Sequence, residues 1–169
     1  QPFAVANFFF IHRDVFQKVG GFDEEFFLYN EEMDLSWRAW LAGYAVTMVE
    51  SAKIHHQGVS SGDRTVENRT NESKRFYANS NQILTLLKNS HGLLLLLVAS
   101  QTALMTLEAF VGALLARQLS FVRWSLLKPL ADCWRLRKYV LAERRRIAGF
   151  RKRGDFWMIR RFFSFRFGR

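Results

Sequence analysis

Residues 19–62 read VGGFDEEFFLYNEEMDLSWRAWLAGYAVTMVESAKIHHQGVSSG, and this stretch decides the expected fold. Its centre predicts a helix over residues 31–42, with acidic side chains in the first turn, where the helix dipole favours negative charge. Two tryptophans and a leucine give this helix an apolar face. Asn30 is the expected N-cap, and Gly43 fits the position just after the helix.

Strand-like segments flank this helix. Residues 3–11 and 44–49 are apolar, β-rich runs, and residues 53–56 are typical of a short strand or a strand end. A short helix is expected over residues 13–19, ended by a Gly-Gly pair because glycine adopts positive φ at little cost. The alternation of strands and helices predicts an α/β fold for this part of the chain.

Ionisable side chains gather at two places in this region. Glu31, Glu32 and Asp34 occupy the start of the helix, and His55 and His56 lie at the end of the last expected strand. Acidic residues at a helix start often serve only the helix dipole, and a strand-end histidine is often only packed or hydrogen-bonded. Neutral imidazole is also a frequent metal ligand, so the histidine pair is a candidate metal site.

A longer series of motifs gives these residues a context. An IHR segment (11–13) is followed by VGGFDEEFFLY (19–29), EEMDL (31–35), RAWLAGY (38–44) and a strand ending in histidine before a Gly/Ser loop (54–61). This series resembles the family 2 inverting glycosyltransferases of the GT-A type, most closely the bacterial rhamnosyltransferase-like branch that builds surface polysaccharides. The resemblance implies part of a GT-A, or nucleotide-diphospho-sugar transferase, domain.

The resemblance implies a role for each candidate residue. Glu32 stands at the position of the family's catalytic base, which removes the proton of the acceptor hydroxyl, although the usual residue there is Asp. Glu31 belongs to the same acidic motif. Asp34 is expected to orient the base, to bind the acceptor or only to pair with Arg38. His56 aligns best with the family histidine that helps to hold a divalent metal, Mg²⁺ or Mn²⁺, on the donor diphosphate.

The resemblance also implies the partners and the missing parts of the site. The donor would be a nucleotide sugar and the acceptor a glycan or lipid-linked molecule, with inversion at the anomeric carbon. The family's nucleotide-binding half and its D-x-D metal motif lie N-terminal to this region, and no D-x-D occurs in the 169 residues. Because a cation on a diphosphate needs several oxygen ligands, we expect a fragment that carries the acceptor side and is inactive alone.

The composition excludes several classes of protein. Apolar residues make up 49% of the chain, and 25 basic against 15 acidic residues give a net charge of +10, which excludes an acidic disordered tail, a collagen and a low-complexity linker. The single cysteine, Cys133, excludes a disulfide scaffold and a multi-cysteine metal site. The charge is divided unevenly, because residues 1–90 carry −2 and residues 117–169 carry +13.

The segment between these charged parts is apolar. Residues 92–116 contain no Lys or Arg and are long enough to span a bilayer, but Gln101 and Glu108 lie on one stripe. A buried helix of a soluble bundle is the alternative. The tail, residues 117–169, interleaves arginines with aromatic residues, a pattern that suits anionic lipid or nucleic acid phosphates. The apolar neighbour favours lipid.

A single crossing at 92–116 would separate the basic tail from a catalytic lobe that needs cytoplasmic nucleotide sugar. The segment therefore either dips into one leaflet and returns or forms a hairpin with residues 119–130, which carry two cations and make a poor second span. We expect a catalytic-domain end (1–63), a linker and helix (64–90) and a helical region (91–169) attached in plane to the cytoplasmic face of the membrane. The alternatives are a non-catalytic membrane-binding module and a basic nucleic-acid-binding protein.

Overall fold

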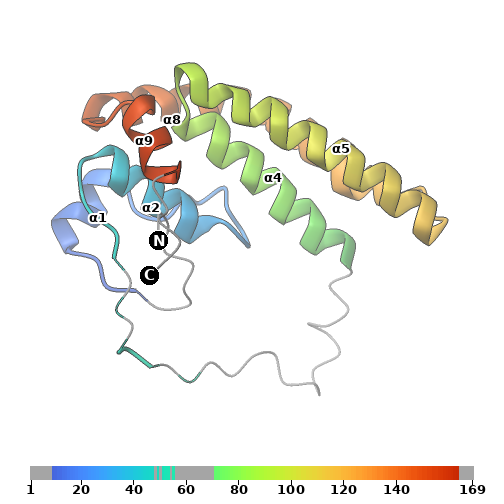
Figure 1. Cartoon of the computed structure of the whole chain (residues 1–169), viewed down its shortest axis with the longest axis horizontal. Coiled ribbons are helices and arrows are strands. Elements are labelled where there is room, and N and C mark those ends of the chain that lie inside the picture. Colours follow the sequence, from blue (N-terminus) through green and yellow to red (C-terminus); the bar gives the residue numbers. More distant parts are fainter. Residues whose placement is uncertain (1–8, 48, 50, 54, 56–70, 164–169) are drawn as a thin grey trace.

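The structure is a computed structural model that describes residues 9–47, 49, 51–53, 55 and 71–163. Every regular element in these residues is helical (Figure 1). The elements, in chain order, are α1 (Arg13–Val19), α2 (Glu31–Leu41), α4 (Asn71–Asn89), the 3-10 turn η1 (Gly92–Leu95), α5 (Leu96–Ala116), α6 (Ser120–Val122), the π-helical turn η2 (Arg123–Leu127), α7 (Lys128–Arg135), α8 (Arg137–Phe150) and α9 (Asp155–Phe163).

The expected α/β fold is wrong for the described residues. Of the three expected strands, the described positions 9–11, 44–47, 49, 53 and 55 lie in irregular backbone without ladder partners. The side chains of Phe9, Ile11 and Tyr44 instead pack against the buried cluster of Val19 and Leu35. An apolar run reports burial, whereas a strand also needs a neighbouring strand to pair its backbone groups, and the described part of the chain provides none.

The two expected helices of the first lobe are confirmed, and glycine ends both. Gly20 has φ +88° and its N–H donates to the carbonyls of Phe16 and Gln17, as expected for a left-handed residue after a helix. Gly43, with φ +96°, follows α2 in the same conformation, and the Tyr44 N–H reaches back to the Ala39 carbonyl. Local sequence signals therefore placed α1 and α2 correctly.

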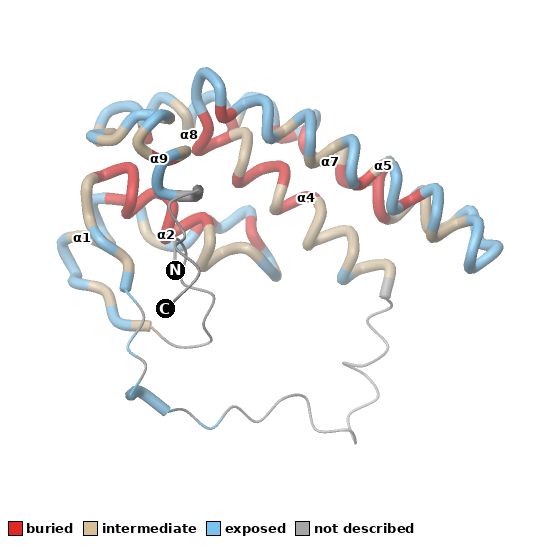
Figure 2. Tube along the Cα trace, in the orientation of Figure 1, coloured by how far each residue is buried: buried red, intermediate tan, exposed pale blue. Residues whose placement is uncertain are grey.

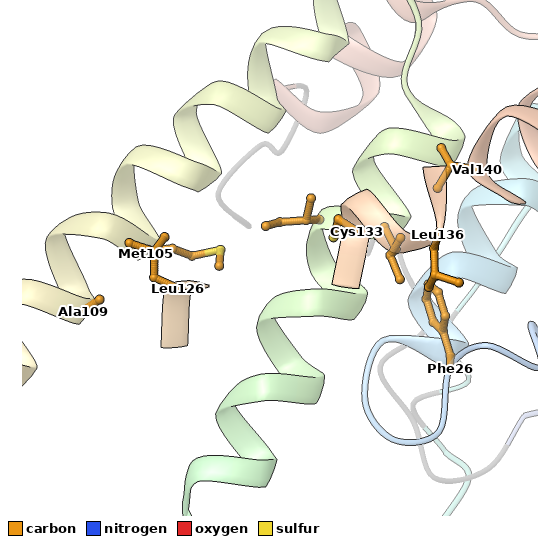
Figure 3. Packing of buried hydrophobic residues seen from close by; sticks show 9 residues of the cluster. Phe26, Met105, Ala109, Leu126, Cys133, Leu136 and Val140 are labelled. Carbon is orange, nitrogen blue, oxygen red and sulfur yellow. The ribbon is translucent and has the colours of Figure 1, made fainter. Parts of the chain in front are cut away.

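Helix α4 is the centre of the structure. It packs against α2, α5, η2, α7 and α8, and the buried residues of its C-terminal half appear red in Figure 2. The main hydrophobic cluster joins residues of α4, α5, η2, α7 and α8 (Figure 3). It also includes Phe26, from the turn before α2. Its buried members are Phe26, Ile83, Leu84, Met105, Ala109, Leu126, Cys133, Leu136 and Val140. A second cluster joins α2 to the C-terminal helices, with Trp40 against Trp157.

The apolar segment forms one arm of a helical hairpin. The chain leaves along η1 and α5, turns at Arg117, which has φ +53°, and returns through α6, η2 and α7. Contacts between α5 and the returning elements hold the arms together, and the Phe121 ring occupies the space beside Gly112. The helix expected over residues 92–116 is present, and the chain before and after it lies on the same side of the hairpin tip (Figure 1).

Candidate active site at the start of α2

The turn that leads into α2 is held in an unusual conformation. Tyr29 and Asn30 both have positive φ, 70° and 67°, a region that costs free energy for residues other than glycine. The Asn81 amide on α4 donates to the Leu28 and Tyr29 carbonyls at 2.8 and 2.9 Å. The Asn30 amide donates to the Ala78 carbonyl at 3.1 Å, and it makes no side-chain cap. Asn30 is therefore a tether to α4 and not the expected side-chain cap.

This tethered turn fixes the two glutamates at the start of α2. Glu31 and Glu32 are both partly buried in the first helical turn. Burial raises the pKa of Glu32 and the neighbouring Glu31 charge raises it further, while a hydrogen bond from its own backbone N–H lowers it. A carboxylate with a raised pKa is a better proton acceptor than an ordinary one, so the environment of Glu32 suits a general base.

Asp34 lies in a different environment two residues later. Its side chain is fully buried, and Oδ2 accepts hydrogen bonds from Arg38 Nε at 2.9 Å and Lys88 Nζ at 3.1 Å. The Asn89 amide donates to Oδ1 at 2.7 Å. The pairing with Arg38, one of three expected roles, is therefore present. Both carboxylate oxygens are directed into the protein, which makes Asp34 a residue that positions α2.

Lys88 links Asp34 to a second buried carboxylate. The Lys88 ammonium forms an ion pair with Asp23 and lies 4.5 Å from the centroid of the Phe26 ring. Burial alone would raise the pKa of Asp23, but the Lys88 charge and hydrogen bonds from Lys88 and Tyr139 hold it below its ordinary value. Burial and the hydrogen bond to Asp23 in turn raise the pKa of the Tyr139 hydroxyl. The resulting buried ion network of Asp23, Lys88, Asp34 and Arg38 joins the turn before α2 to α2 and α4, and Tyr139 of α8 hydrogen-bonds to it through Asp23.

The sequence analysis missed the α4 residues of this site. Asn81, Leu84 and Lys88 are spaced i, i+3 and i+7, so they share one face of α4 with the buried Leu84 in its middle. A lysine and an asparagine on an apolar helix face were the available signal, because such groups stay buried only when partners satisfy them. The identity of those partners, more than fifty residues away for Asp34 and Leu28, depends on tertiary structure.

The proposed metal ligand His56 lies outside the described residues. Its neighbour His55 is described and exposed. Among the residues that the structure describes, no group of three or more His, Cys, Asp or Glu side chains is arranged to hold a metal ion. These residues therefore do not by themselves supply a complete set of ligands for a divalent cation.

Arginines of the basic tail donate hydrogen bonds to backbone carbonyls at the ends of α1, α2 and α4. Arg146 donates to the Val19 carbonyl at the end of α1 at 2.8 Å, and Arg153 donates to the Gly43 carbonyl after α2 at 2.8 Å. Arg144 and Arg151 donate to carbonyls at the end of α4, with Arg151 Nη2 2.5 Å from the Asn89 oxygen. Unpaired carbonyls and the negative end of the helix dipole make helix C-termini favourable sites for cations.

The tail, residues 117–169, was expected to carry its arginines toward anionic lipid or nucleic acid phosphates. Four of them, Arg144, Arg146, Arg151 and Arg153, instead donate to the protein's own carbonyls. A run of arginines in sequence does not distinguish lipid phosphates from helix C-termini, because both offer oxygen acceptors with negative potential.

Comparison with known proteins places this geometry in a family. A model of glycosyl transferase family group 2 matches residues 1–141. The chain belongs to this family. Within it, a 53-residue segment is 43% identical to N-acetylglucosaminyl-diphospho-decaprenol L-rhamnosyltransferase of Mycobacterium tuberculosis, from strain CDC 1551 and from strain H37Rv. The match covers 31% of this chain and 17% of each relative, so it spans less than a fifth of their length. No solved structure matches the chain.

The family membership confirms the resemblance seen in the motifs. The match to the family model, over residues 1–141, extends through α4, α5 and α7, well beyond the acidic motif. The hairpin therefore belongs to the matched region. The tethered turn, Glu31 and Glu32 therefore lie in a glycosyltransferase family protein whose helical arm is part of the family pattern.

Proposed function

We propose that Glu32 is the general base of an inverting glycosyl transfer and that this chain carries the acceptor side of the site. The observation that carries the proposal is a partly buried carboxylate with a raised pKa, fixed at the start of α2 by the turn that Asn30 and Asn81 tether to α4. The family membership supports the reaction type.

In the proposed reaction, the acceptor hydroxyl donates its proton to Glu32 while its oxygen forms a bond to the anomeric carbon. The bond from that carbon to the nucleoside diphosphate breaks, and the diphosphate leaves with the electron pair. Attack from the face opposite the leaving group inverts the configuration. The Glu31 charge beside Glu32 raises the affinity of the base for the proton.

The proposed substrates are a nucleotide-sugar donor, of hexosyl or deoxyhexosyl type, and a glycan or lipid-linked acceptor. The name of the mycobacterial relatives, N-acetylglucosaminyl-diphospho-decaprenol L-rhamnosyltransferase, supports a deoxyhexosyl donor and a lipid-linked acceptor. We also propose that His56 would be one ligand of Mg²⁺ or Mn²⁺, a cation that would supply positive charge beside the leaving diphosphate.

The proposed location is the cytoplasmic face of the membrane. One helix of the described residues, Gly92–Ala116, is long and apolar enough to cross a membrane by length and composition, and only 17% of its most apolar 18-residue window is buried. The return through α6, η2 and α7 supports attachment from one side, because it brings the chain back from the hairpin tip. Glu24 in the first lobe and Arg145 in the tail are exposed sites for labelling.

Substitution of Glu32 tests the base directly. In the full-length protein, Glu32→Gln keeps the shape of the side chain and removes its basicity, so transfer should fall by about 10²–10⁴-fold. Glu24→Gln, at an exposed glutamate outside the tethered turn, is the matched control and should keep wild-type activity. Transfer by Glu32→Gln within about twofold of wild type would favour the alternative of a non-catalytic membrane module.

Labelling of introduced cysteines in oriented vesicles tests the location. The native Cys133 is buried, and burial raises the pKa of its thiol to about 12, so it should remain unreactive in the folded protein. Glu24→Cys and Arg145→Cys should both react from the cytoplasmic side. Reaction from opposite sides would contradict attachment from one side and indicate a true crossing.

A basic nucleic-acid-binding protein is supported less well. Four of the tail arginines already donate to backbone carbonyls, which leaves fewer of their N–H groups free to bind phosphates.

A further inference from the structure

An open groove lies at the tip of the helical hairpin, away from the site at α2. It has a volume of about 700 Å³, and its lining comes from the start of the returning arm. The lining residues are Leu119, Ser120, Arg123, Trp124, Leu127, Lys128 and Ala131. The groove is thus built from two cations, an indole, a hydroxyl and an apolar floor.

The π-helical turn η2 places both cations along the same groove. The Lys128 N–H donates to the Arg123 carbonyl, an i to i+5 bond that places the two residues one turn apart. In an α-helix, with about 3.6 residues per turn, residues five apart lie on different faces. Single π-helical turns occur frequently at functional sites, and here the turn has a direct consequence, because both cations line one groove.

The charge of the groove is uncompensated by acidic side chains. None of its lining residues is acidic, and neither cation forms an ion pair with another described residue. The Lys128 ammonium lies 3.5 Å from the centroid of the Trp124 ring, which orients it beside the indole. Two cations along one groove, neither in an ion pair with a carboxylate, are complementary to a phosphate group.

The apolar part of the groove indicates what carries that phosphate. Leu119 is 85% exposed at the tip and Leu127 is 56% exposed on the groove floor. The end of α5 continues this apolar surface with Leu114 and Leu115, both more than three-quarters exposed. A free phosphate would leave these leucines in water, whereas a phosphate with acyl chains would cover them. Tryptophan is also enriched at the boundary between lipid and water, which fits Trp124.

We propose that Arg123 and Lys128 bind the phosphate of an anionic phospholipid whose acyl chains contact Leu119 and Leu127. This inference rests on the proposed attachment to the membrane and adds a specific headgroup site to it. The site fixes the depth and the rotation of the hairpin, because the tip then lies at the level of the lipid phosphates with the exposed leucines of α5 directed toward the acyl region.

Vesicle sedimentation of the full-length protein tests the groove. The double variant Arg123→Gln, Lys128→Gln should bind vesicles of phosphatidylcholine with phosphatidylglycerol at least about tenfold more weakly than wild type. Lys138→Gln, Arg145→Gln removes the same charge from exposed positions outside the groove and should stay within about threefold of wild type. Equal losses in the two double variants would overturn the proposal, since net charge alone would then explain binding.

Two further arms separate the possible failures. Both double variants should bind vesicles of phosphatidylcholine alone as wild type does, because α5 is unchanged. If wild-type protein binds neutral and anionic vesicles equally, the headgroup site is wrong while attachment to the membrane stands. If it binds neither, the proposed attachment itself is wrong, and the headgroup site with it.

A soluble phosphate is distinguished by competition. Glycerol phosphate should not displace the protein from anionic vesicles, and Leu119→Ser, Leu127→Ser should weaken vesicle binding without a loss of helical circular dichroism. Displacement by glycerol phosphate, with full binding by the leucine variant, would show that the groove binds a free phosphate and would overturn the lipid assignment.

Discussion

Helices α2 and α5 depart in opposite ways from the usual pattern, in which charged side chains are exposed and apolar ones are buried. In α2 the charged side chains of Asp34 and Arg38 are buried, whereas in α5 several leucines and a phenylalanine are exposed. Buried charges and exposed apolar patches are the informative departures from ordinary burial. In α2 the buried ions connect the helix to α4 and fix the direction of its first turn. In α5 the exposed leucines are the basis of the proposed attachment to a membrane.

The largest expected effect is on the buried ions of α2. Lys88→Met fills the space but leaves Asp23 and Asp34 without their shared cation, so the free energy of unfolding should fall by about 3–5 kcal/mol. Urea denaturation of the full-length protein measures the change. Lys74→Met, at an exposed position near the start of α4, is the matched control and should change stability by less than about 0.5 kcal/mol. Equal stabilities for the two variants would contradict the role of Lys88.

Substitution of exposed leucines in α5, unlike that of the buried Lys88, should leave the fold intact. Leu104→Ser, Leu107→Ser, Leu114→Ser removes three exposed apolar side chains, so vesicle binding should weaken by about a hundredfold from lost transfer free energy. Stability without vesicles should change by no more than about 1 kcal/mol. Leu141→Ser, at an exposed leucine of α8, should keep vesicle binding. A triple variant that unfolds in water yet binds vesicles normally would show that α5 is a core helix.

Substitutions that release the tethered turn before α2 should lower both stability and transfer activity, although the turn is partly exposed. Asn81→Ala removes the amide that holds the Leu28 and Tyr29 carbonyls, so stability should fall by about 1–2 kcal/mol. Transfer activity should fall in kcat more than in KM, because the direction of Glu32 changes. Asn79→Ala, which removes a hydrogen bond to the Ser125 carbonyl instead, should lower stability but preserve kcat. Similar kcat values for wild type and Asn81→Ala would separate the turn from catalysis.

A smaller effect is expected on acid stability. The pKa of Asp23 is below its ordinary value of 3.8, so its contribution to stability is fully present above that value and is lost as pH falls through the folded pKa. The unfolding free energy of wild type should therefore decrease toward about pH 2, and that of Asp23→Asn should decrease less. Parallel pH profiles for the two proteins would contradict the lowered pKa.

The sequence predicted the parts of this molecule that depend on local signals. The glycines after α1 and α2 and the acidic first turn of α2 placed two helices correctly. The apolar runs at 3–11 and 44–49 favour strands, but their described positions are irregular, because hydrophobicity does not reveal whether a pairing partner exists. Lys88 and Asn81 were missed as site residues because their partners come from more than fifty residues away. The sequence shows that the tail is rich in arginine, but it does not show that four of these arginines bind backbone carbonyls of the same chain.

The pH dependence of glycosyl transfer tests the role of Glu32 most directly. In the full-length protein, kcat/KM should fall as pH decreases through the pKa of Glu32, which burial and Glu31 hold above the ordinary value of 4.5. Glu31→Gln removes the neighbouring charge and should move this acidic limb to lower pH, whereas Glu24→Gln should leave it in place. An acidic limb at or below the ordinary carboxylate pKa, or one that Glu31→Gln does not move, would contradict Glu32 as the general base.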